Sequence, residues 1–157
     1  MRKTILLVAI LLMAAGTNEA RAQGFRWGPE LSLADDADFG IGARMEFDFA
    51  RSPLTLIANG DVFFPGNDIT WIELNANLIY NFDLASAPTV TPYAGGGLNI
   101  RYASWDNGSL DNDSDTDPGL NLLGGVRFDA GSISPFVEAK FEIEGGDQFV
   151  VTGGILF

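Results

Sequence analysis

Apolar and polar residues alternate strictly along residues 39–49, which makes this segment the clearest pattern in the chain. Odd positions are apolar, and even positions hold glycine or a charged residue. Side chains of a β-strand point alternately to its two faces, so this period of two predicts a strand with one apolar and one polar face. Its length matches the roughly 9 to 11 residues with which a tilted strand crosses a bilayer.

The same alternation recurs along the chain and predicts eight strands in all. Short, weakly charged turns alternate with acidic connections, of which residues 103–119 form the longest. An even strand number with such connections is typical of an up-and-down transmembrane barrel. Pro29 cannot donate a ladder hydrogen bond, so a bulge or a late strand start is expected there. The expected strands are 25–34, 39–49, 54–64, 69–82, 90–102, 120–129, 137–144 and 149–157.

The last of these segments indicates how the sheet ends. Its apolar face consists of Phe149, Val151, Ile155 and Phe157. An apolar strand that ends on Phe157 would leave an exposed sheet edge in water, which soluble proteins avoid. Pairing with the first strand would remove that edge and turn the apolar face toward lipid. We therefore expect an all-β fold, an eight-stranded antiparallel up-and-down transmembrane β-barrel.

The first residues are excluded from this barrel. Arg2 and Lys3 precede an apolar run over residues 5–15, and Ala20 and Ala22 form a small-residue cleavage site. That order is typical of a secretory signal peptide. The run is too short for a transmembrane helix, which needs about 20 apolar residues. The expected organisation is a cleavable signal peptide over 1–22 and a barrel domain over 23–157.

Composition then narrows the function. The chain contains no cysteine and no histidine, and its formal net charge is −12. The absence of cysteine excludes a disulfide framework, and the absence of histidine removes the usual general base and metal ligand. The negative charge argues against binding to nucleic acid. We therefore expect neither an enzyme nor a cofactor.

Alternation alone does not say which face lies inside. A lipocalin-like barrel also has eight strands, but its apolar residues line a ligand cavity and its polar residues face water. Here the aromatic residues of the apolar face lie toward strand ends, as in the interfacial girdles of membrane barrels. This favours lipid outside. A soluble ligand-binding barrel and a narrow ion-conducting pore remain the alternatives.

Charged residues of the inward face are expected to pair, because an isolated charge in a narrow lumen would be costly. Eight strands leave an interior that side chains fill, so a salt-bridged, non-conducting lumen is favoured over an ion path. Arg44 and Lys140 are expected at mid-height beside the glutamates. The expected lumen ion pairs involve Arg44, Lys140 and Arg127 with Glu46, Glu138, Glu142 and Asp129.

The longest acidic connection carries aspartates at alternate positions, namely Asp111, Asp113, Asp115 and Asp117. This spacing is similar to that of calcium loops. Thr116 and Leu122, however, occupy the sixth and twelfth positions, where such loops have glycine and glutamate. A solvated acidic loop is the favoured interpretation, and weak Ca²⁺ or Mg²⁺ binding is the alternative.

Two sequence segments and the signal peptide carry a resemblance to a known family. The segments are Thr91-Pro92-Tyr93-Ala94-Gly95-Gly96-Gly97-Leu98 and Gly153-Gly154-Ile155-Leu156-Phe157. With them the chain resembles the small eight-stranded outer-membrane β-barrels, which include opacity-type surface proteins, the OmpX group and the OmpA membrane domain.

The resemblance implies a location and a set of partners. The expected location is a bacterial outer membrane with both termini periplasmic, and the expected state is a monomer surrounded by lipid. In that family an aromatic C-terminal strand is the signal read by the barrel-insertion machinery. The resemblance assigns this role to the strand that ends on Phe157, with Phe149, Val151 and Ile155. A structural or surface-contact role in the cell envelope is expected.

Overall fold

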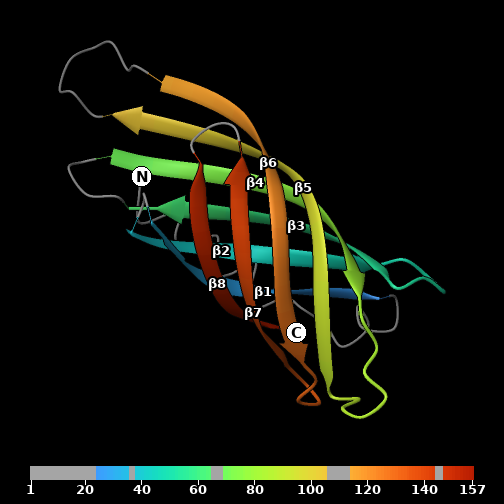
Figure 1. Cartoon of the computed structure of the whole chain (residues 1–157). Coiled ribbons are helices and arrows are strands. Elements are labelled where there is room, and N and C mark those ends of the chain that lie inside the picture. Colours follow the sequence, from blue (N-terminus) through green and yellow to red (C-terminus); the bar gives the residue numbers. More distant parts are fainter. Residues whose placement is uncertain (1–23, 36–37, 65–68, 106–113, 144–146) are drawn as a thin grey trace.

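A computed structural model describes residues 24–35, 38–64, 69–105, 114–143 and 147–157. These residues form eight antiparallel strands, each hydrogen-bonded to the next, and the last strand pairs with the first (Figure 1). The predicted fold class, a closed up-and-down barrel, is confirmed. The strands are β1 (Phe25–Ala34), β2 (Asp38–Asp48), β3 (Leu54–Phe63), β4 (Ile69–Asn81), β5 (Val90–Trp105), β6 (Ser114–Phe128), β7 (Ser134–Ile143) and β8 (Gln148–Leu156).

β1 and β8 form the seam that closes the barrel. Leu31 lies opposite Gly153 in this antiparallel pair. Further along, Trp27 and Phe157 exchange two backbone hydrogen bonds of 3.3 and 2.8 Å. Their ring centroids lie 6.0 Å apart on the outer face. The closing strand therefore finds its partner in the first strand, as the exposed-edge argument predicted.

Pro29 lies within β1 without a bulge. It pairs with Ala43 of β2 in an unbroken register, so the predicted bulge or late strand start is wrong. Trp27 bonds to β8 through its backbone, and the alternate residue Pro29 turns its backbone the same way. Proline thus removes one donor from the seam and leaves the register intact. The strands approach closely here, because a Cβ on Gly28 would collide with the carbonyl oxygen of Ile155.

Some strands are longer than the alternation predicts. β5 continues to Trp105 and β6 begins at Ser114, so the predicted loop over residues 103–119 is wrong at both of its ends. β7 begins at Ser134, three residues before the predicted start at Val137. Backbone hydrogen bonds need no apolar face, so a ladder can continue where the alternation of side chains has stopped. The β5–β6 hairpin therefore extends beyond the segment that hydrophobic periodicity detects.

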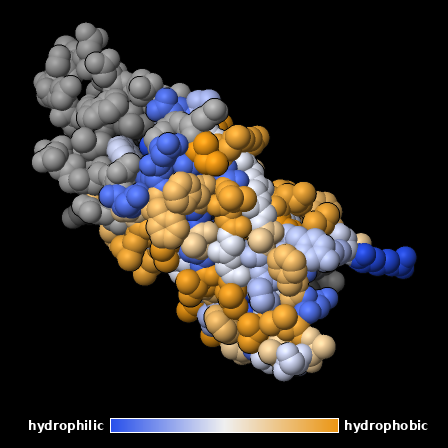
Figure 2. Space-filling view, in the orientation of Figure 1, coloured by the Kyte–Doolittle hydropathy of each residue, from blue (hydrophilic) through white to orange (hydrophobic). Residues whose placement is uncertain are grey.

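The two faces of the sheet differ in polarity. Large apolar side chains are exposed on the outer face, with Leu33 at 61% and Leu122 at 64%. Inside, Arg44 is 1% exposed and Glu46 is fully buried. Figure 2 shows the apolar side chains gathered over the outer surface of the strands. This polarity is the reverse of that in a lipocalin-like barrel, so the alternative with an apolar ligand cavity is wrong.

Two small apolar groups lie within the polar interior. Ala34, Phe63 and Val150 pack together, with Trp71 against them. The second group consists of Ile57, Ile79, Tyr93 and Leu123. These contacts explain why Ile57 and Phe63 point inward from β3, although most apolar residues of the strands point outward.

Some sequence predictions concern residues that the structure does not describe. The signal peptide with Ala20 and Ala22 lies outside the described residues, as do Asp111 and Asp113. In the described part of the chain, no helix is both long and apolar enough to cross a membrane.

Candidate functional site

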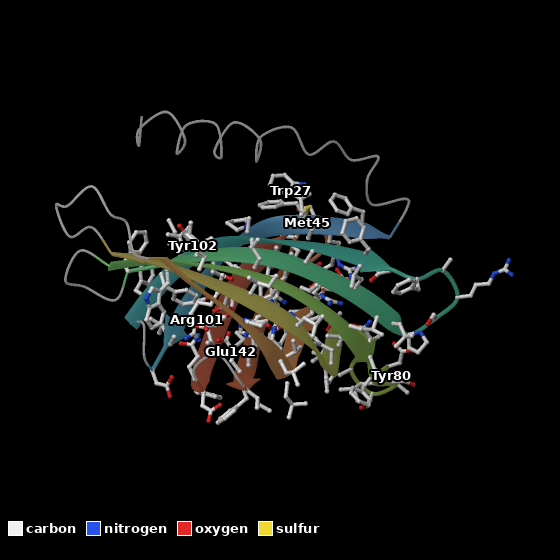
Figure 3. The ribbon with its side chains drawn as sticks, turned by 90° about the horizontal axis from the view of Figure 1, so that it is seen from above. Trp27, Met45, Tyr80, Arg101, Tyr102 and Glu142 are labelled. Carbon is white, nitrogen blue, oxygen red and sulfur yellow. The ribbon has the colours of Figure 1, made fainter. Side chains whose placement is uncertain are left out.

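Polar side chains from all eight strands fill the barrel interior (Figure 3). Alternate residues of each strand point inward, and in most strands these are the polar residues of the alternating pattern. In Figure 3 the labelled Trp27, Met45 and Tyr80 point away from the barrel, whereas Arg101 and Glu142 point into it. The charged residues form three groups, which we call the terminal, central and distal clusters, from the end that holds Phe157 to the opposite end.

The central cluster is built around Arg44 of β2. Its Nε donates to Glu30 Oε2 at 2.8 Å, and its two terminal nitrogens donate to the two carboxylate oxygens of Glu138 at 2.9 and 2.8 Å. The guanidinium lies 4.1 Å from the ring centroid of Phe136. The hydroxyl of Tyr93 donates to Glu138 at 2.9 Å. One buried cation thus links β1, β2 and β7 across the lumen.

The distal cluster is built around Lys140 of β7. Its ammonium group forms ion pairs with Glu73 and, at 2.6 Å, with Glu142. Arg101 approaches the other oxygen of Glu142 at 3.1 Å. Gln148 donates to that carboxylate at 2.6 Å. These contacts join β4, β5, β7 and β8.

A set of amides connects the distal cluster with the middle of the barrel. Asn121 donates to Asn75 at 2.7 Å and to Asn77 at 2.9 Å, and it accepts from Asn99 at 3.0 Å. Asn75 in turn accepts from Lys140 at 3.2 Å. Buried amides are stable only where their donors and acceptors are paired, so this set fixes the positions of β4, β5 and β6.

The terminal cluster lies at the end of the barrel that holds the seam residues Trp27 and Phe157. Arg26 donates to both carboxylate oxygens of Asp48, at 2.7 and 2.8 Å, and pairs with Glu46 at 3.0 Å. Arg127 lies 2.7 Å from the same oxygen of Glu46. Polar cavities of about 320 and 580 Å³ meet at Arg26, Asp48 and Arg127. The lumen is therefore open to solvent at its mouth and filled further in.

Several predicted lumen residues come together in the structure. Arg44 meets Glu138, Lys140 meets Glu142, and Arg127 meets Glu46. Arg44 is also within 3.8 Å of Glu46. Each of these three cations contacts more than one acceptor group. Buried ions are tolerated in a protein under this condition.

Asp129 is the exception among these residues. β6 ends at Phe128, and Asp129 lies exposed in the following turn, where it accepts a hydrogen bond from the Gly131 amide at 3.0 Å. It forms no ion pair with another described residue. Its assignment to the lumen is wrong, because the alternation was extended one residue past the end of the strand.

Sequence reasoning missed one partner of Arg44 in the central cluster and one partner of Lys140 in the distal cluster. Glu30 pairs with Arg44, and Glu73 pairs with Lys140. Both lie at inward positions of their strands, so the alternation marks them as lumen residues. Glu30 and Arg44 lie on the neighbouring strands β1 and β2, where the register of the hairpin decides which side chains meet. Glu73 and Lys140 lie on β4 and β7, which are not neighbours, and alternation carries no information about contacts across the barrel.

The residues assigned to the assembly signal all lie on the outer face. Phe149, Val151, Ile155 and Phe157 are exposed, and they alternate with the buried Val150, Thr152 and Leu156. Phe149 packs against Phe141 of β7, and Phe157 against Trp27 of β1, each pair with ring centroids 6.0 Å apart.

The aspartates of the acidic connection are only partly described. Asp117 lies opposite Arg101 in the β5–β6 ladder, and Asp115 lies opposite Ala103. Among the described residues, no three His, Cys, Asp or Glu side chains come together as a metal site.

A closed eight-stranded barrel with an apolar exterior and an interior filled by ion pairs has the architecture of a small outer-membrane barrel. Comparison with known proteins agrees at the level of the fold. Neisserial surface protein A superposes with a TM-score of 0.66 at 17% identity, over 84% of this chain and 94% of that one. Ail, the attachment invasion locus protein of Yersinia pestis, superposes with a TM-score of 0.55 at 12% identity, over 85% of this chain and 96% of that one.

A third structure of the same fold is the outer-membrane enzyme PagL. It has a TM-score of 0.52 at 12% identity, over 83% of this chain and 96% of that one. No family model matches the sequence, and no curated protein matches it. At these identities the similarity establishes the fold, which surface proteins and an enzyme share, and function has to be argued from the lumen and the outer face.

Proposed function

We propose that this protein is an integral outer-membrane barrel with a non-conducting lumen and a structural or surface-contact role in the cell envelope. Both termini lie in the periplasm in this proposal, and the acidic connections face the outside. The names of the similar neisserial surface protein and of the attachment invasion locus protein support a role at the cell surface.

The outer face supports insertion into lipid. Strands β1 to β8 expose large apolar side chains, among them Leu33, Leu98 and Leu122 at more than half of their area. A soluble protein rarely exposes a contiguous apolar surface of this kind. In a bilayer the same surface is buried, and the closed ladder leaves no strand edge without hydrogen bonds in the hydrocarbon region.

The central cluster carries the proposal of a closed lumen. Arg44 is held from two sides by Glu30 and Glu138, and all three side chains are almost completely buried. The amides and the distal cluster continue the filling toward the other end. An ion would have to displace several charge-assisted hydrogen bonds to pass.

Conductance in planar lipid bilayers tests the closed lumen. The folded protein is expected to insert without producing discrete current steps. A double variant, Arg44→Ser with Glu138→Ser, serves as the positive control because it removes the side chains that cross the lumen centre. Steps of equal size in the wild-type protein and in this variant would contradict the proposal and favour a narrow pore.

Epitope labelling tests the orientation and the surface role. An epitope inserted into residues 106–113 is expected to be reached by antibody on intact cells, and an epitope inserted into the turn at residues 84–88, at the same end of the barrel as the termini, only after permeabilisation. The reverse pattern would contradict a periplasmic location of the termini. Heat-modifiable gel mobility checks that both fusions are folded, because the folded barrel migrates faster before heating than the unfolded chain does after heating.

The remaining features of the proposal concern chemistry and partners. The absence of histidine supports a role other than catalysis, since acyl-transfer and hydrolytic sites commonly rely on it. The expected partners are outer-membrane lipid and, through the outward side chains of the closing strand, the barrel-assembly machinery. We propose a monomer without a resident cofactor, with weak Ca²⁺ or Mg²⁺ binding by the acidic connection as the alternative.

A further inference from the structure

Carboxylates outnumber cations among the described side chains that point into the lumen. The cations are Arg26, Arg44, Arg101, Arg127 and Lys140. The carboxylates are Glu30, Glu46, Asp48, Asp61, Glu73, Glu138 and Glu142. A closed, low-dielectric interior tolerates uncompensated charge poorly, so the excess has to be accommodated at particular residues.

Asp61 of β3 is the carboxylate that the ion pairs leave out. It is 2% exposed, and no described cation lies within ion-pair distance of it. Its partners are neutral: Ser32 donates to Oδ1 at 3.2 Å, and the side-chain nitrogen of Asn59 donates to Oδ2 at 2.9 Å. The other six carboxylates of this set each have a cationic partner.

The charges that face Asp61 are mostly of its own sign. Glu30 of β1 accepts from the same Asn59 nitrogen at 2.8 Å, so one amide nitrogen holds two carboxylates. Glu73 of β4 lies directly opposite Asp61 in the β3–β4 ladder. On the other side β2 presents Gly42, which has no side chain. Lys140 of β7 forms ion pairs with Glu73 and Glu142 and none with Asp61.

Two neighbouring buried carboxylates that share no cation rarely ionise together. Glu30 pairs with Arg44, whereas Asp61 has only neutral donors. A proton needs no coordination shell, and no metal-type group of carboxylates exists among the described residues. We propose that Asp61 is a proton-binding site of the closed lumen and that it stays protonated at neutral pH while its ion-paired neighbours are charged.

This site couples the stability of the barrel to pH in a defined direction. In the unfolded chain an aspartate loses its proton near pH 4. If Asp61 is protonated in the folded barrel, the chain takes up one proton from solution whenever it folds above that pH. Stability contributed by Asp61 therefore falls as the pH rises, and the unfolding equilibrium constant increases by up to about tenfold per pH unit. The increase ends at the pH where Asp61 ionises in the folded barrel.

Comparison of the wild-type protein with Asp61→Asn tests this. Both are unfolded by urea in phosphatidylcholine vesicles between pH 4 and pH 9. The asparagine keeps the shape and cannot ionise, so the ratio of wild-type to variant unfolding constants should rise across this range up to and beyond neutrality. A ratio that is constant, or that falls with pH, would show that Asp61 is ionised in the fold and would overturn the proposal.

Glu138→Gln is the matched control. Glu138 is equally buried but paired with Arg44, so its charge should stabilise the fold. The corresponding ratio of unfolding constants should therefore show no rise across this range. The same trend for both variants would point to a general effect of acid on the barrel and contradict a specific site at Asp61.

Infrared spectroscopy of the folded protein gives a second readout that needs no unfolding. A carbonyl band of a protonated carboxylic acid is expected at neutral pH, shifted by ¹³C-labelled aspartate and absent from Asp61→Asn. Replacing sodium by choline in the buffer should leave the band unchanged. Its absence from the wild-type protein, or its appearance only without sodium, would show that Asp61 is ionised or holds a metal cation. The conductance of the barrel is a separate measurement, so failure of the closed-lumen proposal would be recognised independently.

Discussion

Arg44 in β2 and Glu138 in β7 form a two-point contact across the barrel interior, with both guanidinium nitrogens of Arg44 within 2.9 Å of the carboxylate oxygens. Their strands are not neighbours in the sheet, so no backbone ladder brings them together. The contact fixes the distance between two strands that β1 and β8 separate in the closed sheet.

Removal of one partner of this pair is expected to be strongly destabilising. Glu138→Gln leaves Arg44 buried with Glu30 as its close anionic partner, and loss of one member of a buried pair typically costs about 3 to 5 kcal/mol. Urea unfolding in lipid vesicles at neutral pH measures the change. In a double-mutant cycle with Arg44→Met, the two losses should be clearly non-additive, and additive losses would mean that the pair is not coupled.

Lipid contact is predicted to depend on the face of β4. Ala76 is exposed on the outer side and lies between Ala58 and Leu98 of the adjacent strands. Ala76→Arg should lower the free energy of unfolding in vesicles by about 2 to 4 kcal/mol, because it places a charge near the bilayer midplane. Ala76→Leu is the control and should be close to neutral. Equal stability of the two variants would contradict a lipid-facing position.

The alternation of residues along the chain was sufficient to predict the barrel. Residues such as Phe47 and Asp48 follow each other on opposite faces, and eight such segments leave closure as the simple way to remove both edges. The ends of β5 and β6 could not be predicted, because Asp115 and Asp117 extend the ladder where no apolar face is required. Alternation marks strands that have one apolar face, and it carries no information about a ladder that continues without one.

The lumen was predictable as a set of residues but not as a set of contacts. Lys140 and Glu142 share a strand, and their pairing follows from proximity along it. Glu73 reaches Lys140 from β4, and this depends on strand tilt and register around the whole barrel, which are collective properties of the closed sheet. For the same reason the isolation of Asp61 cannot be seen in the sequence.

Calcium is predicted to leave the stability unchanged. The acidic connection lacks the glycine and the terminal glutamate of a calcium loop, so its aspartates are expected to be solvated separately. A thermal unfolding series with and without millimolar Ca²⁺ measures this. A rise in the melting temperature that disappears in a variant with Asp111, Asp113, Asp115 and Asp117 replaced by Asn would establish the alternative, a weak cation site.

Phe157 and Phe141 form a natural pair for testing the assembly signal. Each ring is exposed on the outer face and packs against one aromatic neighbour at a centroid distance of 6.0 Å, Phe157 against Trp27 and Phe141 against Phe149. Phe141 lies in β7, outside the residues assigned to the signal. Replacement by Ala should therefore cost each protein a similar amount of stability once folded, on the order of 1 kcal/mol for the aromatic contact.

In cells, Phe157→Ala is expected to reduce the fraction of folded protein in the outer membrane several-fold, whereas Phe141→Ala is expected to assemble normally. Heat-modifiable gel mobility of membrane fractions measures the folded form, and refolding of both variants into vesicles provides the stability comparison. If both variants assemble equally well, or if the loss in cells follows the loss of stability in vesicles, the aromatic ring of Phe157 acts in packing and not as a recognition signal.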